Sequence, residues 1–305
     1  MTPVSHTLIN ALAAAGKEVY VPDQFHGRSF SAPVQAIAQR FVTARLQGER
    51  LAAFPGPLPK DLTEAYECQE AAIELWPDTI AGWKVGLIGP ELATLFNQDR
   101  LAGPIFSASV SWSSPGVRSA FAVFTDGFAA VEAEFVLRLG SDAPRDKVTW
   151  THDEAFAMVE SVHCAVETAG SPLATINSLG PRAIVADFGN NAGLIMGPAL
   201  DQWGVRSPQH WRCESFIDGA SAGRGHGAVS PGGPFESLRF LLALNARRGR
   251  PLKRGDLVST GAVTGVHEIR AGQSAQVVFA DAGEIMCVAE PFIPAVHSGA
   301  RSGAP

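Results

Sequence analysis

The chain has 305 residues, of which 46% are hydrophobic and 18% charged, and its formal net charge is −6. This length and composition provide an ample core for one large or two small globular domains. A mildly acidic chain offers little positive charge to a phosphate backbone, so nucleic acid is not an expected partner. No stretch approaches the roughly 20 apolar residues that cross a bilayer, and we expect no membrane partner.

The four cysteines are widely scattered and form no Cys-x-x-Cys pair. This spacing argues against a structural zinc site and against a disulfide framework. The first twenty residues lack the basic start of a secretory signal. We therefore expect the protein to be cytoplasmic.

Two helices are predicted near the start, after an N-terminal extension over residues 1–32 that we expect to be loosely attached or to form an arm that packs on a neighbour. From Pro33, apolar residues recur at helical spacing until Gly48 supplies a stop. A second helix is predicted to begin at Asp61, which has Glu64 three residues on, and to end before Pro77.

After these helices the pattern changes to short apolar runs separated by glycine and proline, which is typical of a curved or closed sheet. One helix, from Phe235 to Arg247, interrupts the later strands. The predicted strands cover residues 82–87, 183–186, 193–196, 256–259 and 275–279.

The predicted fold class is α+β, with a helical lead-in packed against a curved mixed sheet or barrel-like roll. The lead-in and the first strand occupy residues 33–105, the catalytic β-roll residues 106–295, and a flexible tail residues 296–305.

Glu132-Ala133-Glu134 lies within the apolar run from Val131 to Leu139. On a strand, Glu132 and Glu134 leave the same face, and the aromatic and branched residues around them indicate a buried strand. Two neighbouring buried anions repel each other unless a proton or a cation neutralises them. With Glu167 as a third carboxylate, the set suits a hard divalent ion such as Mg²⁺. The alternative is the solvated face of an edge strand, which commonly carries such pairs.

Lys84 lies in a predicted strand between Gly82 and Gly86 and projects from the face opposite to Trp83. A lysine on a strand is usually a surface residue. If Lys84 faces the glutamates instead, its ammonium balances their charge or stabilises a developing oxyanion.

Five motifs occur in the order found in the 2-keto-4-pentenoate hydratases, and the chain resembles that family over roughly residues 33–293. The family also includes 2-oxohept-3-ene-1,7-dioate hydratase and 4-oxalocrotonate decarboxylase, and it lies within the wider fumarylacetoacetate hydrolase superfamily. The motifs are Gly82-Trp83-Lys84-Val85-Gly86-Leu87, Val131-Glu132-Ala133-Glu134-Phe135-Val136-Leu137, Ala165-Val166-Glu167, Asn191-Ala192-Gly193-Leu194-Ile195-Met196-Gly197 and Gly255-Asp256-Leu257-Val258-Ser259-Thr260-Gly261.

The resemblance implies a fumarylacetoacetate-hydrolase-like fold and a homo-oligomer. It also implies that Glu132, Glu134 and Glu167 bind Mg²⁺ or Mn²⁺. Lys84 resembles the family's lysine beside the substrate, and Thr260 resembles the hydroxyl that meets the substrate carboxylate.

Three further residues are candidates for the catalytic or substrate-binding site, on the basis of less specific motifs. Asp187 and Asn191 match a polar stretch that lines the family's site, which makes Asp187 a catalytic candidate and Asn191 a substrate-binding one. The alternative for Asp187 is a turn residue. Arg224, within the glycine-rich segment 223–227, is expected on a mobile loop over the site as a contact for a second carboxylate.

A 2-oxo or 2-hydroxydienoic acid chelates a cation through one carboxylate oxygen and the neighbouring oxygen, which fixes its plane and stabilises an enolate. The predicted function is a metal-dependent hydratase that adds water to 2-hydroxypenta-2,4-dienoate-type substrates and gives 4-hydroxy-2-oxo acids in aromatic-compound catabolism. The alternatives are a decarboxylase or C–C hydrolase acting on 4-oxalocrotonate, oxaloacetate or acylpyruvates, and a noncatalytic relative that binds 2-oxo acids.

Two departures from the family pattern affect the prediction of water addition. Ala108 stands where family members often carry an aspartate, so a proton-relay group is absent at that position. Gly232-Gly233-Pro234 replaces a Gly-His-Pro segment.

Overall fold

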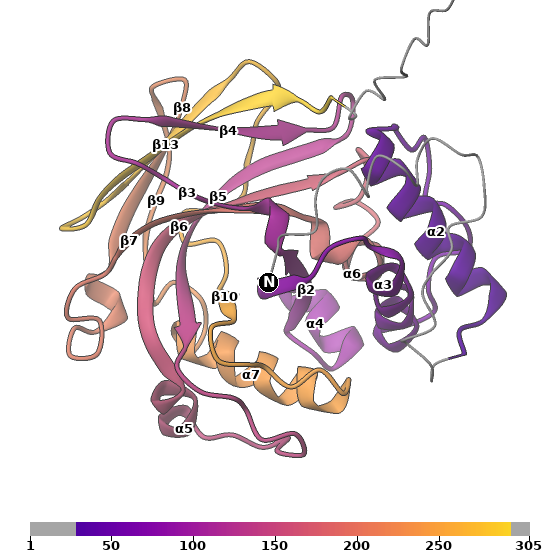
Figure 1. The fold of residues 1–305 in the computed structure, drawn as a ribbon, viewed down its shortest axis with the longest axis horizontal. Coiled ribbons are helices and arrows are strands. Elements are labelled where there is room, and N and C mark those ends of the chain that lie inside the picture. The colour runs from indigo at the N-terminus through magenta and orange to yellow at the C-terminus, as the bar shows by residue number, and fades with distance from the viewer. Residues whose placement is uncertain (1–28, 294–305) are drawn as a thin grey trace, which may run out of the picture.

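Two mixed β-sheets form the centre of the computed structural model, which describes residues 29–293 (Figure 1). The first sheet has the order β2 (Arg100–Phe106), β1 (Ile80–Leu87), β10 (Leu257–Ser259), β5 (Phe128–Leu139), β6 (Val159–Ser171), β7 (Asn191–Ala199) and β3 (Val110–Trp112), with β11 (His267–Glu268) paired to β5. The second has the order β4 (Arg118–Val123), β13 (Gly283–Pro291), β12 (Ser274–Phe279), β8 (Arg212–Ile217) and β9 (Ala220–His226). Parallel pairs β1–β10, β3–β7 and β4–β13 occur among antiparallel ones, as predicted for a mixed sheet.

Helices α2 and α3 lie together at one side of the sheets, and α7 lies near the end of β10 (Figure 1). The helices are α2 (Ala32–Gln47), α3 (Leu62–Leu75), α4 (Pro90–Phe96), α5 (His152–Ala157), α6 (Pro181–Ala186) and α7 (Gly233–Arg247). Short 3₁₀ turns are η1 (Ser107–Ser109), η2 (Phe188–Asn190) and η3 (Pro208–His210).

The two predicted N-terminal helices are confirmed together with their end signals. Gly48 ends α2 in the left-handed conformation at φ 66°, which costs glycine little. The Asp61 carboxylate accepts the Glu64 backbone N–H at 2.9 Å and so caps α3.

Two segment predictions are wrong. Residues 183–186, predicted as a strand, form the end of α6, because Gly180 turns the chain at φ 81° and Pro181 occupies the first helical position. The segment 223–227 was predicted as a loop, but its residues 223–226 form the last part of strand β9. The other predicted strands and the helix ending at Arg247 are confirmed.

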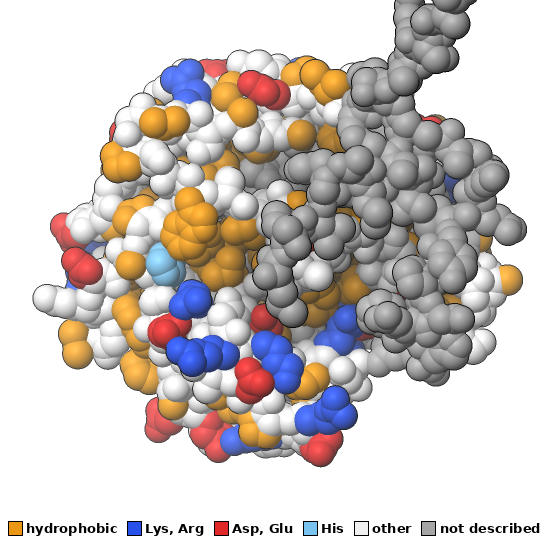
Figure 2. Space-filling model, in the orientation of Figure 1, with side chains coloured by type: hydrophobic (Ala, Val, Ile, Leu, Met, Phe, Trp, Pro, Cys, Tyr) orange, Lys and Arg blue, Asp and Glu red, His pale blue; other side chains and the backbone are white. Residues whose placement is uncertain are grey.

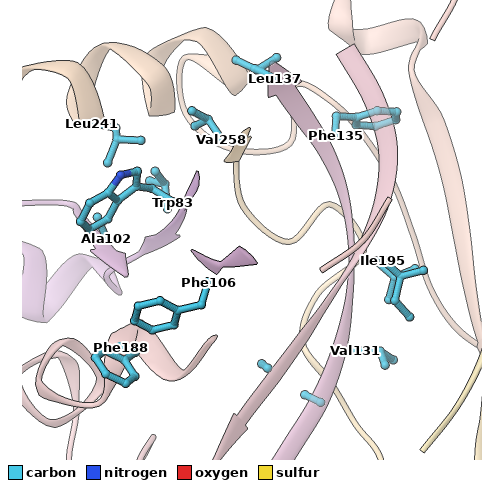
Figure 3. Packing of buried hydrophobic residues seen from close by; sticks show 14 of the residues in the cluster. Trp83, Ala102, Phe106, Val131, Phe135, Leu137, Phe188, Ile195, Leu241 and Val258 are labelled. Atoms are coloured by element: carbon cyan, nitrogen blue, oxygen red, sulfur yellow. The ribbon is translucent and has the colours of Figure 1, made fainter. Parts of the chain in front are cut away.

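The core fixes which face of β1 meets the helices. Trp83 is 2% exposed and packs with Ala102, Leu241 and Val258 on the α7 side of the first sheet (Figure 3). Since side chains alternate along a strand, Lys84 must leave the opposite face.

The predicted boundary at residue 105 falls within β2, and β1 and β2 pair in the same sheet as β10 and β5. The division of the chain at that point stays a prediction. Residues 1–28 of the predicted extension, and all of the predicted tail, lie outside the described residues.

Candidate metal and substrate site

Three buried carboxylates meet on one face of the β5–β6 pair. Glu132 on β5 lies directly opposite Glu167 on β6, and Glu134 follows two residues along on the same face. Their side chains are 5%, 0% and 0% exposed for Glu132, Glu134 and Glu167, so the solvated-edge alternative is excluded. Each residue offers an oxygen within 4.8 Å of the other two. The predicted cluster is therefore present in the structure.

Lys84 on β1 points to the same face of the sheet as the three glutamates. It pairs with Ser259 on β10, which pairs with Val136 on β5, and side chains of directly paired residues leave the same face of a sheet. The Lys84 Nζ lies 3.3 Å from Glu167 Oε1, and the side chain is 5% exposed. The surface alternative for this lysine is excluded.

Glycines allow the lysine and its neighbours to approach closely. A Cβ added to Gly103 would lie 2.0 Å from the Phe188 carbonyl oxygen, and one added to Gly189 would lie 3.2 Å from Lys84 Cδ. Gly103 pairs with Lys84 across β1 and β2. Only a residue without a side chain fits at Gly103, and η2 can then lie against the lysine stem.

Burial and mutual repulsion change the protonation of the cluster. Burial raises the pKa of Glu132 to about 7, with Lys84 opposing the shift and Glu167 adding to it. The pKa of Glu134 is raised well above its usual value, first by burial and then by Glu167 and Glu132. Burial alone would lower the pKa of Lys84, but the three carboxylates outweigh it and raise that pKa, so the lysine stays an ammonium.

Neighbouring donors orient the carboxylates. Ser259 Oγ and the Gly261 backbone N–H donate to Glu134 Oε2 at 2.5 and 2.9 Å, and Asn191 Nδ2 donates to Glu167 Oε1 at 3.1 Å. The sequence prediction missed the roles of Ser259 and Gly261, although both lie in the last of the five motifs. Both residues are direct neighbours of Thr260 in the sequence, and this position could have indicated their roles; only Thr260 was chosen as a site candidate.

Two carboxylate oxygens remain without a hydrogen-bond partner in the described part of the chain. They are Glu134 Oε1 and Glu167 Oε2, both fully buried. A buried anionic oxygen that lacks a partner is costly, whereas a divalent cation with oxygen ligands would satisfy it. The three residues thus fit the predicted Mg²⁺ or Mn²⁺.

A cavity of about 260 Å³ opens from this cluster toward the surface. Lys84, Glu132, Ser230 and Gly261 form its buried end. Its other described lining residues are Gly86, Leu87, Leu101, Asn177, Ile184, Asn190, Ala262 and Val266. A small acid fits a space of this volume, which is just below the range of pockets for drug-sized ligands.

Asp187 does not meet the carboxylate cluster. Its Oδ1 lies 2.5 Å from Arg45 Nε, and its Oδ2 accepts from Ser171 Oγ at 2.6 Å. The same guanidinium donates to the carbonyl oxygens of Asn191 and Gly170, each at 2.9 Å. This carboxylate is held in a buried ion pair beside the start of β7, and a catalytic role for Asp187 stays a prediction.

Thr260 and Arg224 are not among the described lining residues of the carboxylate cavity, and their substrate contacts stay predictions. Thr260 Oγ1 donates to the Phe135 carbonyl at 2.8 Å, so its proton is committed to the backbone. Arg224 lies on β9 with its side chain 75% exposed and its Nε 2.9 Å from Glu214 Oε1. Arg224 does not line the cavity. Its neighbours Gly223 and Gly225 face the backbone of Val263 and Thr264, so the Arg224 side chain leaves the opposite face of β9.

The two departures from the family pattern are separated in space. Ala108 lies in η1 and lines another cavity of about 400 Å³, and its backbone N–H donates to Asp78 Oδ2 at 2.7 Å. Gly233 begins α7 and donates its N–H to the carbonyl of Ser230, a residue that lines the carboxylate cavity.

Known proteins with similar sequences are hydratases. The chain is 27% identical to the 2-keto-4-pentenoate hydratase of Burkholderia vietnamiensis over 248 residues, which cover 78% of this chain and 90% of the relative. It is 26% identical to the TodF product hydratase of Pseudomonas putida over 155 residues, which cover 51% of this chain and 57% of the relative. The predicted resemblance is confirmed. No family profile matches the chain.

Solved structures confirm the predicted fold class. The 4-oxalocrotonate decarboxylase of Pseudomonas putida G7, complexed with magnesium and adipate, matches with a TM-score of 0.72 at 19% identity, over 86% of this chain and 100% of the other. The fumarylpyruvate hydrolase of Pseudomonas aeruginosa, in complex with Mn²⁺ and pyruvate, matches with a TM-score of 0.52 at 16% identity, over 69% and 89% of the two chains.

Proposed function

We propose that the chain is a divalent-metal-dependent hydratase that adds water to 2-hydroxypenta-2,4-dienoate-type acids and gives 4-hydroxy-2-oxo acids in aromatic-compound catabolism. The observation that carries this proposal is the buried cluster of Glu132, Glu134 and Glu167 beside Lys84, of which Glu132 and Lys84 line the buried end of one cavity. The likeness to 2-keto-4-pentenoate hydratases supports it.

In this proposal the three glutamates hold Mg²⁺ or Mn²⁺. A cation bound there supplies Lewis-acid polarisation to the 2-oxo or 2-hydroxy group of the substrate. Ser259, Gly261 and Asn191 keep the carboxylates in place through the hydrogen bonds already described.

The raised pKa of Lys84 keeps its side chain an ammonium, which stabilises the negative charge left on the substrate's 2-oxygen when the enol O–H proton is lost. Lys84 also relays a proton: the substrate loses one proton from the 2-oxygen and gains one at its terminal carbon, so the dienol becomes the unsaturated ketone with no net change at the lysine. Water then adds at the distal carbon of that ketone. The burial of Lys84 and Glu132 keeps other water away from the reacting end.

The test is the metal-dependent loss of dienoate absorbance in the presence of purified protein. We expect activity with Mg²⁺ or Mn²⁺, its loss with a chelator, and a reduction of at least about 100-fold in Glu132→Gln and Glu167→Gln. Glu160→Gln is the matched control, because Glu160 also lies on β6 but its side chain is 39% exposed. Full activity in either cluster variant would refute the proposal.

We further propose that the protein is a cytoplasmic homo-oligomer. All four cysteines are buried and free, which fits a reducing compartment. Exposed hydrophobic side chains gather over β3 and β7 (Figure 2), and Trp112 on the edge strand β3 is 60% exposed. Within residues 29–293 no helix has the length and hydropathy to span a bilayer. Light scattering coupled to gel filtration tests the oligomer, and a monomer at all concentrations would contradict it.

A further inference from the structure

The segment between β9 and α7, residues 227–232, forms one wall of the carboxylate cavity. Ser230 is the residue of this segment that lines the cavity, and it is 8% exposed. Its Oγ lies 3.6 Å from the position that a Cβ would take on Gly261, whose backbone N–H binds Glu134. The Ser230 hydroxyl is therefore beside the carboxylate cluster, at the same end of the cavity as Lys84.

The backbone of Ser230 is held from two sides. Its carbonyl accepts the N–H of Gly233, the first residue of α7, at 2.8 Å. The next carbonyl, that of Pro231, accepts from the guanidinium of Arg100 on β2. Arg100 is 2% exposed and also donates to Asp99 Oδ2 at 2.5 Å. Burial of a guanidinium is costly unless it is paired and hydrogen-bonded, so the Pro231 carbonyl and Asp99 fix Arg100 as much as Arg100 fixes the segment.

Two glycines make the turn that follows Ser230. Gly232 and Gly233 have φ angles of 74° and 70°, in the left-handed region that glycine adopts at little cost. A Cβ on Gly232 would lie 2.6 Å from the Cβ of Glu236, so the turn packs directly on α7. The backbone at Ser230 has little freedom as a result, and the hydroxyl keeps its place in the cavity wall.

The Ser230 hydroxyl makes no hydrogen bond to the protein within residues 29–293. The other hydroxyls near the cluster are committed: Ser259 donates to Glu134, and Thr260 donates to a backbone carbonyl. Among the described residues at the buried end of the cavity, Lys84 and Ser230 are therefore the side chains that can donate to a bound acid. A hydrogen bond to an ionised oxygen is about twice as strong as one between neutral groups.

We propose that Ser230 is a further substrate-contacting residue, whose hydroxyl donates to the carboxylate of a bound 2-oxo acid, and that Arg100 is its positioning residue. Arg100 acts through the Pro231 carbonyl and does not line the cavity. Both residues lie outside the five motifs that carry the family resemblance, so the arrangement is a feature of this chain's own sequence. The inference rests on the function proposed above.

The experiment measures pyruvate binding to the Mg²⁺-loaded protein by calorimetry. Ser230→Ala should weaken pyruvate binding about 10-fold or more, because a donor to a charged oxygen is lost. Its affinity for Mg²⁺ without pyruvate should be unchanged, whereas a general loss of the site's geometry would weaken both. Ser221→Ala is the matched control, since Ser221 is an exposed serine of β9 whose hydroxyl binds Glu214, and it should bind pyruvate as the wild type does. Wild-type pyruvate affinity in Ser230→Ala would overturn the inference.

Arg100→Met tests the positioning role. The fold should tolerate it, because Asp99 is 57% exposed and regains hydration when the guanidinium is removed. Pyruvate affinity should fall about 10-fold, and the double variant with Ser230→Ala should bind no more weakly than the weaker single variant, because both changes remove one contact. Additive losses would contradict the positioning role.

Steady-state kinetics separate this inference from the proposed function. With 2-hydroxypenta-2,4-dienoate, Ser230→Ala and Arg100→Met should raise KM more than they lower kcat. Loss of pyruvate binding in Ser230→Ala, together with no dienoate turnover by the wild type, would refute the hydratase and support the substrate contact. Dienoate turnover by the wild type with an unchanged KM in Ser230→Ala would support the hydratase and refute the contact.

Discussion

Replacing Glu132 with Gln should stabilise the metal-free protein at neutral and higher pH while abolishing its stabilisation by Mg²⁺. In the metal-free state the Glu132 carboxylate is buried beside Glu167, and burial raises its pKa to about 7 despite the attraction of Lys84. A glutamine in the same position has no charge to bury at any pH, and it is a far weaker ligand for a hard cation.

The size and sign of the effect follow from that pKa. In the unfolded chain the pKa of Glu132 returns to its ordinary value of 4.5, so the folded protein keeps a proton that the unfolded chain has lost between that value and about 7. The stability that the protonated Glu132 carboxyl contributes to the folded protein is fully present below the pKa of the unfolded chain, 4.5. It is lost as the pH rises through the pKa in the folded protein, about 7. A shift from 4.5 to about 7 corresponds to about 3 kcal/mol. For a domain of this size that is on the order of 10 °C in Tm.

The assay is thermal unfolding between about pH 5 and about pH 8, with a chelator and with Mg²⁺. With the chelator, the Tm of the wild type should fall relative to Glu132→Gln as the pH rises, because only the wild type must ionise a buried carboxyl at position 132, whereas both proteins keep the buried Glu134. With Mg²⁺ the order should reverse at high pH, because the cation stabilises the ionised cluster and protons no longer compete for it.

The control is Glu160→Gln, which removes an exposed carboxylate from β6 and should parallel the wild type under all conditions. Parallel curves for wild type and Glu132→Gln would refute the reasoning. A Mg²⁺ response that survives in Glu132→Gln would refute the assignment of this residue as a ligand.

Three further substitutions test the roles of neighbouring residues. Lys84→Met should lower kcat by at least about 100-fold without weakening Mg²⁺ binding, because it removes a proton donor and a like charge near the cation; calorimetry and steady-state kinetics on one sample check this. Asp187→Asn should cost about 3–5 kcal/mol in urea unfolding, because it leaves Arg45 buried without its anion, whereas kcat of the folded protein should stay within about threefold. Ser259→Ala removes the 2.5 Å hydrogen bond to Glu134 Oε2 and should weaken Mg²⁺ affinity about 10-fold to 100-fold, measured by calorimetry.

The carboxylate cluster could be predicted because a strand has a period of two. That period places Glu132 and Glu134 on one face, and the apolar residues around them indicate burial. Glu167, the third carboxylate, was added because the motif Ala165-Val166-Glu167 resembles that of the family. The direct opposition of Glu132 and Glu167 is a matter of strand register, which depends on the whole sheet and not on either segment alone.

Other residues were beyond local reasoning. Asp187 lies in a motif with Asn191, but its partner Arg45 is 142 positions away on α2, and no spacing rule joins the two. Residues 183–186 have the composition of a strand, yet a preceding Gly-Pro start and packing against α3 make them helical. For Asp187 a tertiary contact decides what the local pattern leaves open, whereas for residues 183–186 the Gly180-Pro181 start is a local helix signal that the strand-like composition outweighed in the prediction.

The central claim is that three buried glutamates hold one divalent cation. Anomalous X-ray scattering from crystals grown with Mn²⁺ tests it most directly. The account predicts one peak at an ordinary coordination distance, about 2.0–2.6 Å, from carboxylate oxygens of Glu132, Glu134 and Glu167. A Mn²⁺ peak elsewhere, with these three carboxylates left unligated, would contradict it.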